Sequence, residues 1–190
     1  DGVDVLTSTT VTRLEQDEET WLVLDEEGNR WQASGVIATA PLPQLHRMLP
    51  TGPTSWTSHP YEATWTVVLA HEATCPDAVR TGLAILGHQV EASENPNGVV
   101  VHLSPDWSRE HLEMEPANVS QAFRSIVEGL GETALNWVKS GTLQAHRWRF
   151  GRASTLGERA NMPRLVEAGD AWGEPVGTGS AAFRSGAWAA

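Results

Sequence analysis

The residues best suited to chemistry lie near the C-terminus, where an apolar stretch ends in Gly169-Asp170 and further glycines follow at positions 173, 177 and 179. The pattern predicts a strand that leads through a glycine turn into a helix of small residues over 180–190. Such a turn sets a carboxylate beside the N–H groups of a helix N-terminus. The carboxylate can accept hydrogen bonds from sugar-like hydroxyls and the N–H groups favour a phosphate, so we infer a nucleotide cofactor with a polyhydroxyl linker.

A plainer interpretation of these residues is a strand, a turn and a helix that pack closely because their side chains are small. The segment 177–182 also matches the formal dinucleotide fingerprint G-x-G-x-x-A. That fingerprint requires a strand directly before its first glycine and a complete βαβ unit, whereas Pro175 intervenes here. We therefore expect a partner segment to a dinucleotide-binding fold rather than the phosphate loop of the fold itself.

Other common catalytic patterns are missing from the sequence. The seven histidines include no i, i+4 pair, so two imidazoles do not share a helix face and no metal site is predicted. No G-x-S-x-G elbow offers a nucleophile for acyl transfer. Cys75 is the single cysteine, which excludes an internal disulfide. The sequence therefore assigns no catalytic residue.

A second dense cluster is His146-Arg147-Trp148-Arg149. Two guanidinium groups and an imidazole beside an indole could hold an anion and stack on a planar ring, although strand arginines also commonly form ion-paired faces. Period-two alternation places His146, Trp148 and Phe150 on one face and the arginines on the other. We expect Trp148 to stack on a planar substrate or cofactor and Arg147 to be a structural ion-pair partner.

The elements that position these residues fall into three regions. Strands over 10–14, 21–24 and 30–33, with a hairpin turn at 26–29, predict a β-meander, which a short buried strand over 35–40 follows. Strands over 65–70, 98–103 and 143–150 predict a second sheet, with a helix capped by Ser104 and an amphipathic helix over 119–130. The final strand and helix return to the first region.

This order predicts an α+β fold with three segments. Residues 1–50 and 151–190 would form one domain, and residues 51–150 an inserted substrate domain with a mixed sheet. Length alone allows one domain or two small ones, since 190 residues can bury a real core. The chain lacks an initiator Met and begins in mid-pattern, so we expect it to be a piece of a longer protein.

The charge and hydropathy of the chain limit its partners. A net charge of −11 without any Lys/Arg run makes nucleic acid an unfavourable partner. No apolar run reaches the roughly 18 residues of a spanning helix, and the N-terminus lacks the features of a signal peptide. We therefore expect a cytoplasmic protein with a small-molecule substrate and no membrane partner, and the sequence predicts no oligomeric state.

With these segments in order, the chain resembles the renalase-like branch of the flavin-containing amine oxidase superfamily. The resemblance is most specific in Pro-Asp-Trp-Ser at 105–108, His-Arg-Trp-Arg at 146–149 and the terminal Gly-Asp. The matching segments, in family order, are residues 36–41 with 43–44, then 61–69, 100–112, 146–150, 168–172 and 185–186.

The resemblance implies non-covalent FAD in a dinucleotide fold, whose first βαβ unit carries a Gly-rich phosphate loop that this chain does not contain. It places Val11 near the adenine and Gly169-Asp170 at the ribityl–phosphate region. The backbone amides of Ala181 and Ala182 would point at the pyrimidine edge of the flavin.

The same resemblance implies that His146, Trp148 and Trp172 border the isoalloxazine and the substrate cavity. The implied activity is that of an FAD-dependent oxidase, acting on a small amine-like or dihydronicotinamide-like substrate with O₂ as acceptor. These 190 residues alone would be inactive. The alternative is a non-catalytic binding or remnant module on a flavoprotein scaffold.

Overall fold

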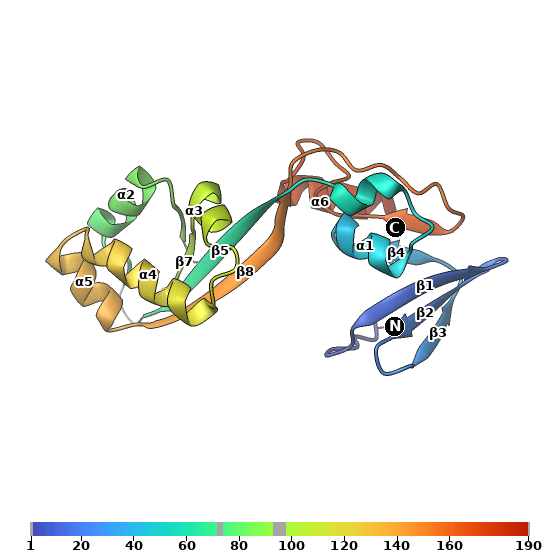
Figure 1. The fold of residues 1–190 in the computed structure, drawn as a ribbon, viewed down its shortest axis with the longest axis horizontal. Helices are drawn as coiled ribbons and strands as arrows, with labels where there is room; N and C mark the ends of the chain where they lie inside the picture. The colour runs from blue at the N-terminus through green and yellow to red at the C-terminus, as the bar shows by residue number, and fades with distance from the viewer. Residues whose placement is uncertain (1, 72–73, 93–97, 190) are drawn as a thin grey trace. The chain divides into compact units, whose positions relative to one another are not determined.

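The chain forms two compact units in a computed structural model that describes residues 2–71, 74–92 and 98–189 (Figure 1). Unit 1 comprises Asp1–Pro60 and Arg152–Ala190, and unit 2 comprises Tyr61–Gly151. Unit 2 is thus an insertion, because the chain leaves unit 1 after Pro60 and returns to it at Arg152. The fold is mixed, with helices and three separate sheets among the described residues.

Unit 1 begins with the predicted meander, a three-stranded antiparallel sheet of β1 (Val11–Asp17), β2 (Thr20–Asp25) and β3 (Arg30–Ala33). Asp25 closes the β2–β3 turn by accepting hydrogen bonds from the side-chain amide of Asn29 at 2.8 Å and from its N–H at 2.8 Å. These bonds, the side-chain bond foremost, hold the pKa of Asp25 below its ordinary value. The carboxylate of Asp25 therefore stabilises the β2–β3 turn.

A short parallel pair forms the centre of unit 1. Here β4 (Val36–Ala38) lies beside β9 (Leu165–Glu167), with Val36 opposite Leu165 and Ala38 opposite Glu167. The predicted final strand is thus shorter than expected. Glu167 is buried on β9, where it accepts hydrogen bonds from the N–H of Ala160 at 2.7 Å and from Arg159 at 3.2 Å. This charge is paired and hydrogen-bonded, as a buried carboxylate must be.

The helices of unit 1 are short. They are α1 (Leu42–Met48), the 3₁₀ helix η1 (Thr54–Ser58) and α6 (Gly179–Ala189). Leu42 and Leu45 bury one face of α1, and Trp56 of η1 is fully buried with its Nε1 donating to the carbonyl of Glu158 at 2.6 Å. The sequence analysis assigned no element to the stretch that contains η1.

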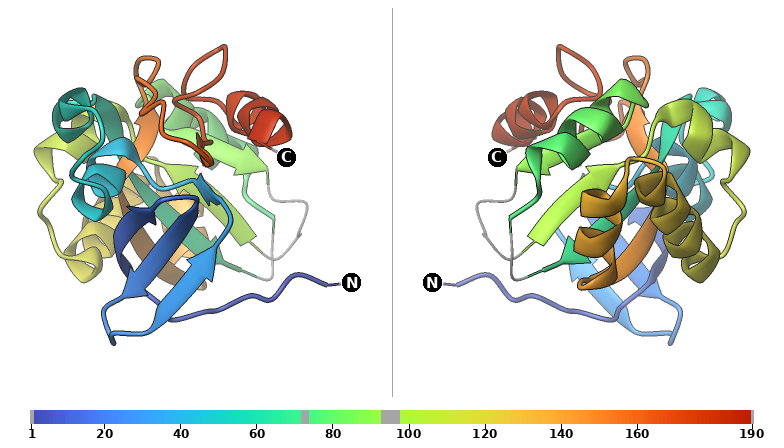
Figure 2. Two further views of the ribbon diagram at one scale, coloured as in Figure 1. Left: turned by 90° about the vertical axis from the view of Figure 1, so that its right-hand side faces the viewer. Right: turned by 90° about the vertical axis from the view of Figure 1, so that its left-hand side faces the viewer.

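Unit 2 is a four-stranded sheet in the order β6-β7-β5-β8, with helices packed against it (Figure 2). Its core joins Trp65, Val67 and Leu69 of β5 to Val119 and Phe123 of α4. Alternation along β5 explains this, because residues 65, 67 and 69 share one face of the strand. The elements of unit 2 are β5 (Tyr61–Ala70), α2 (Asp77–Ile85), β6 (Gln89–Ala92), β7 (Gly98–His102), α3 (Pro105–Glu110), α4 (Pro116–Glu128), α5 (Glu132–Lys139) and β8 (Thr142–Ala153), whose last two residues belong to unit 1.

Local signals in the sequence located some of these elements and missed others. Ser104 caps α3 through its hydroxyl, with Pro105 in the first turn, as predicted. Helices α2 and α5 and strand β6 were not predicted. In α2 the sequence is interrupted by Gly82, which lowers helix propensity. A Cβ at Gly82 would lie 2.7 Å from the Leu130 side chain. Glycine therefore allows α2 to pack closely against Leu130, a contact that the local sequence pattern does not predict.

His88 supports the start of α3 from an adjoining segment. It is 6% exposed, and its Nδ1 accepts a hydrogen bond from the N–H of Ser104 at 3.1 Å. The hydroxyl of Ser104 in turn accepts the N–H of Trp107 at 3.3 Å. Nδ1 must be unprotonated to act as acceptor, and burial lowers the pKa of His88.

This arrangement predicts that acid destabilises the fold. Because the folded pKa of His88 lies below its unfolded value of about 6.5, the unfolded state binds more protons below that pH. The stabilisation should be complete above about pH 6.5 and fall by at most about 1.4 kcal/mol per pH unit as the pH decreases. Urea unfolding between pH 7 and pH 5 measures the slope. His88→Gln should reduce it, whereas the exposed control His146→Gln should not, and equal slopes for wild type and His88→Gln would contradict the account.

Candidate functional site

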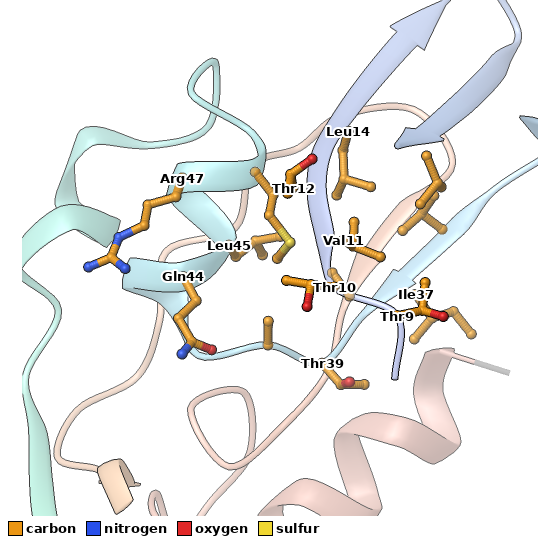
Figure 3. Close-up of a pocket in the computed structure, with 15 residues that line it drawn as sticks. Thr9, Thr10, Val11, Thr12, Leu14, Ile37, Thr39, Gln44, Leu45 and Arg47 are labelled. Carbon is orange, nitrogen blue, oxygen red and sulfur yellow. The ribbon is translucent and has the colours of Figure 1, made fainter. Parts of the chain in front are cut away.

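A cavity of about 740 Å³ lies in unit 1 between β1, β4 and α1 (Figure 3). Its apolar lining includes Val11, Leu14 and Leu45, and threonine hydroxyls at positions 9, 10, 12 and 39 surround it. An apolar cavity with a few polar groups suits a planar heterocycle that carries hydroxyls. Val11, which the resemblance placed near an adenine, is thus a lining residue of this cavity.

The backbone of β1 adds hydrogen-bonding capacity at the cavity. β1 is an edge strand of its sheet, so one side of its backbone has no neighbouring strand in that sheet. Its pairing with β2 shifts register between Val11 and Arg13, which is a bulge. Bulges re-aim backbone and side chains at the rims of sheets. The edge near Val11 can therefore offer N–H and C=O groups to a ring with donors and acceptors on its own edge.

The carboxyl ends of the parallel pair meet beside this cavity. Thr39 follows β4 and lines the cavity, while Gly169-Asp170 follows β9. The N–H of Ala168 donates to the carbonyl of Ala38 at 2.9 Å, which continues the pairing beyond β9. In open sheets with parallel strands, ligands bind outside the carboxyl ends of the strands. This edge is therefore the candidate cofactor site of unit 1.

Asp170 is held in a fixed orientation at this edge. Its Oδ2 accepts the N–H of Ala153 at 2.8 Å, and its carbonyl accepts the N–H of Gly177 at 3.0 Å. The Nε2 of His59 lies 3.1 Å from the carbonyl oxygen of Thr155. Burial lowers the pKa of this imidazole, whereas the hydrogen bond with Thr155 and the negative charge of Asp170 act to raise it. The bond from Ala153 orients the carboxylate.

Ser185 ties helix α6 to the end of β9. Its hydroxyl oxygen lies 2.8 Å from the N–H nitrogen of Gly169, from which it accepts, and 2.9 Å from the carbonyls of Gly169 and Ala182. Gly169 has φ +142, a conformation that side chains with a Cβ rarely adopt. The sequence named Ser185 only as part of the resemblance, and no local signal showed this bridge, which depends on residues 16 apart.

The N-terminal turn of α6 is capped from within the chain. The hydroxyl of Thr178 accepts the N–H of Ala181 at 3.1 Å, and its carbonyl accepts the N–H of Ala182 at 3.1 Å. Both amides that the resemblance aimed at a flavin therefore have acceptors already. Ala181 is fully buried against Gly173, where a Cβ would lie 2.7 Å from the Ala181 carbonyl oxygen. A cofactor contact of Ala181 and Ala182 stays a prediction.

Trp172 has a structural environment in unit 1. The guanidinium of Arg159 lies 4.9 Å from the centroid of its ring. A Cβ at Gly157 would come within 2.8 Å of the same ring, so the indole fills the space beside that glycine. Its assignment to a substrate cavity remains a prediction.

Strand β8 of unit 2 carries the other aromatic candidates. The rings of His146 and Trp148 meet edge to face at 4.5 Å, and Trp148 is 50% exposed. On the other face, Arg149 binds both carboxylate oxygens of Glu113 at 2.8 and 2.9 Å, and Arg147 binds the same carboxylate at 3.2 Å. The predicted alternation and the ion-pair role of Arg147 are both confirmed. The bonds from Arg149 hold the pKa of Glu113 below its ordinary value.

Two motifs that carried the resemblance both contact Trp65 within unit 2. Arg147 donates to the carbonyl of Leu112 at 2.8 Å and lies 5.8 Å above the ring of Trp65. Trp65 Nε1 donates to the carbonyl of His111 at 3.0 Å, and the ring of His111 stacks on Trp107 at 4.1 Å. Residues of Pro-Asp-Trp-Ser and His-Arg-Trp-Arg therefore contact Trp65 from two elements, and Trp148 lies on the opposite face of β8.

Unit 1 thus contains Val11, Gly169, Asp170, Ala181, Ala182 and Trp172, whereas His146 and Trp148 belong to unit 2. Within the described residues, no group of three or more His, Cys, Asp or Glu side chains is arranged to hold a metal ion. No helix in the part of the chain that the structure describes is both long and apolar enough to cross a bilayer.

The fold is shared with part of several solved oxidases. Cyclohexylamine oxidase from Brevibacterium oxydans IH-35A matches 94% of this chain and 46% of its own, with a TM-score of 0.62 and 12% identity. The putative protoporphyrinogen oxidase from Exiguobacterium sp. 255-15 matches 95% and 46%, with a TM-score of 0.55 and 15% identity. Putrescine oxidase bound to putrescine matches 94% and 46%, with a TM-score of 0.54 and 15% identity.

No protein-family model matches the chain, and no curated protein matches its sequence. The chain spans less than half of each of these three oxidases. At these identities the likeness defines the fold alone.

The close approach of Gly173 to α6 predicts the effect of adding a methyl group there. Gly173→Ala should destabilise the protein by about 1–3 kcal/mol, because the new Cβ would displace the buried backbone of Ala181. The control is Gly186→Ala within α6, where a Cβ meets nothing within 4 Å. That change should leave stability unaltered or raise it by up to about 1 kcal/mol. Urea unfolding measures the free energy of unfolding of both variants. Equal values for Gly173→Ala and Gly186→Ala would contradict this packing of α6.

Proposed function

We propose that this chain is part of an FAD-dependent oxidoreductase, which oxidises a small amine-like or dihydronicotinamide-like substrate and passes the electrons to O₂. The observation that carries the proposal is the parallel β4–β9 pair, whose carboxyl ends lie beside an apolar cavity and the oriented carboxylate of Asp170. Likeness in fold to oxidases named for cyclohexylamine and putrescine supports an amine-like substrate.

The residues of unit 1 fit the adenine and ribityl parts of FAD. The cavity at Val11 has the apolar lining and the strand edge that a purine needs. Asp170 Oδ1 would accept a hydrogen bond from a ribityl hydroxyl, because Ala153 already fixes the other oxygen. When bound, the flavin supplies the redox chemistry, so the chain itself has only to hold and orient the ring and the substrate.

The diphosphate of FAD requires donors that unit 1 does not concentrate. A net charge of −11 opposes a dianion unless N–H groups or cations face it directly. A parallel sheet of two three-residue strands is also unusually small, since such sheets are normally larger and covered on both faces. Ile37 of β4 is 54% exposed. We propose that a βαβ unit with a phosphate loop completes this sheet and supplies the donors.

The exposed face of β8 would meet the substrate. The indole of Trp148 can stack on a planar dihydropyridine or attract an ammonium group, and contact with the His146 ring holds it in one orientation. Arg147 and Arg149 are held by Glu113 on the opposite face. A cationic substrate on the Trp148 face therefore does not meet their guanidinium groups.

The alternative is a non-catalytic binding module built on the same scaffold. It is favoured by the small parallel sheet, because without a phosphate loop FAD loses charge-assisted hydrogen bonds worth roughly 1.5–3 kcal/mol each. Tight, stoichiometric binding of FAD by the 190 residues alone would refute this alternative.

The flavin content of the full-length protein tests the proposal. The purified protein should show flavin absorbance, or acquire it when FAD is added. Asp170→Ala should weaken FAD binding by about tenfold or more, the value of one charged hydrogen bond, and leave substrate preference in the residual holoenzyme unchanged. Asp170→Asn, which keeps an acceptor for Ala153, should weaken binding less, and the exposed control Asp17→Ala should not weaken it at all. A protein that takes up no flavin refutes the function, and undiminished affinity in Asp170→Ala refutes the role of that residue.

The Trp148 face gives a separate kinetic test. Trp148→Ala should raise KM or slow flavin reduction by about two- to tenfold while FAD stays bound, because a stacking contact worth about 0.5–1.5 kcal/mol is lost. Trp148→Phe should recover part of the loss, and Gln144→Ala on the same strand should have no effect. Stopped-flow reduction of the holoenzyme measures each rate. Unaltered kinetics in Trp148→Ala would remove β8 from the substrate site.

A further inference from the structure

Arg47 stands where two cavities of unit 1 meet. Beside the cavity at Val11 lies a second one of about 640 Å³, lined by residues 12–16 of β1, by residues 49–51 and by Met162. Thr12, Leu14 and Arg47 line both cavities. The side chain of Arg47 therefore borders both cavities.

Arg47 forms no ion pair with a described residue, that is, with a carboxylate among residues 2–71, 74–92 and 98–189. By contrast, Arg13 pairs with Glu15 at 2.7 Å, and Arg159 pairs with Glu167 at 3.2 Å. In a chain with a net charge of −11, a guanidinium left without a carboxylate beside two cavities is available to an anionic ligand.

Gln44 accompanies Arg47 on α1. The two residues are three positions apart, so they share a face of the helix, while Leu42 and Leu45 are buried. Figure 3 shows Gln44 and Arg47 extending from α1, with the guanidinium of Arg47 on the side of the helix away from β1 and with Thr10, Val11 and Thr12 across the cavity. The site thus combines an apolar wall for a ring, hydroxyls for a sugar, and an amide with a guanidinium for an anion.

We propose that Arg47, assisted by Gln44, binds the phosphate of an adenine nucleotide whose base lies against Val11. The proposal rests on the proposed function, because it concerns the same cavity and the nucleotide half of the same cofactor. It adds a cationic contact on α1 to the ligand contacts expected at β1 and Asp170. A guanidinium can bind two phosphate oxygens at once, which makes it better suited to this role than an ammonium group.

The test compares AMP with adenosine, because the two ligands differ only by the phosphate. Calorimetric titration of the 190-residue chain at low ionic strength should show AMP binding about tenfold tighter than adenosine. Arg47→Gln should abolish this preference and leave adenosine binding unchanged. Arg47→Lys should retain part of it. The control Arg30→Gln, a strand arginine outside both cavities, should retain all of it.

Three results would overturn the proposal: no binding of either ligand, equal affinity for both in the wild type, or a preserved AMP preference in Arg47→Gln. These outcomes are separate from those that decide the proposed function. Adenosine binding without a preference for AMP, together with flavin in the full-length protein, would refute the role of Arg47 alone. An AMP preference that depends on Arg47 in a protein that takes up no flavin would refute the proposed function alone.

Discussion

The pairing of β4 with β9 is the interaction on which the architecture of unit 1 depends. Val36 and Leu165 are paired although the whole of unit 2 lies between them in the sequence. This short ladder therefore joins the two segments of the chain that form unit 1. The parallel direction sets the carboxyl ends of both strands at one edge, which places Thr39 of the cavity and the Gly169-Asp170 turn there. Three hydrogen bonds from Arg159 and Ala160 to the buried Glu167 hold β9 in place.

Unit 2 depends on a different contact, the set of bonds around Trp65. Its backbone N–H donates to the hydroxyl of Ser108 at 3.0 Å, its indole donates to His111, and Arg147 covers its ring. The residues of the two tryptophan-containing motifs are therefore needed to build unit 2. Part of the resemblance therefore reflects the fold, whereas Trp148 is exposed on the other face of β8.

Much of the fold could be predicted from local patterns. The meander follows from β-branched and aromatic residues and from the hairpin turn at 26–29, and the start of α3 follows from Ser104 with Pro105. Elements that depend on distant contacts could not be predicted. Helix α2 contains a glycine that faces Leu130, and the burial of Glu167 depends on a partner eight residues away in a loop.

The candidate site divides in the same way. Gly169-Asp170 and the ion-pairing side of β8 were visible in the sequence, because residue type and period determine them. The Thr178 cap, the Ser185 bridge and the cavities beside Arg47 were not visible, since each depends on how separate segments meet. The adenine role of Val11 came from resemblance, and the structure adds the cavity that this residue lines.

A crystal structure of the full-length protein with FAD tests the central claim most directly. The account predicts the adenine in the cavity between β1, β4 and α1, in contact with Val11, and a ribityl hydroxyl within hydrogen-bonding distance of Asp170. Electron density for FAD elsewhere, with the cavity at Val11 filled by protein side chains and Asp170 bonded only to Ala153, would contradict it.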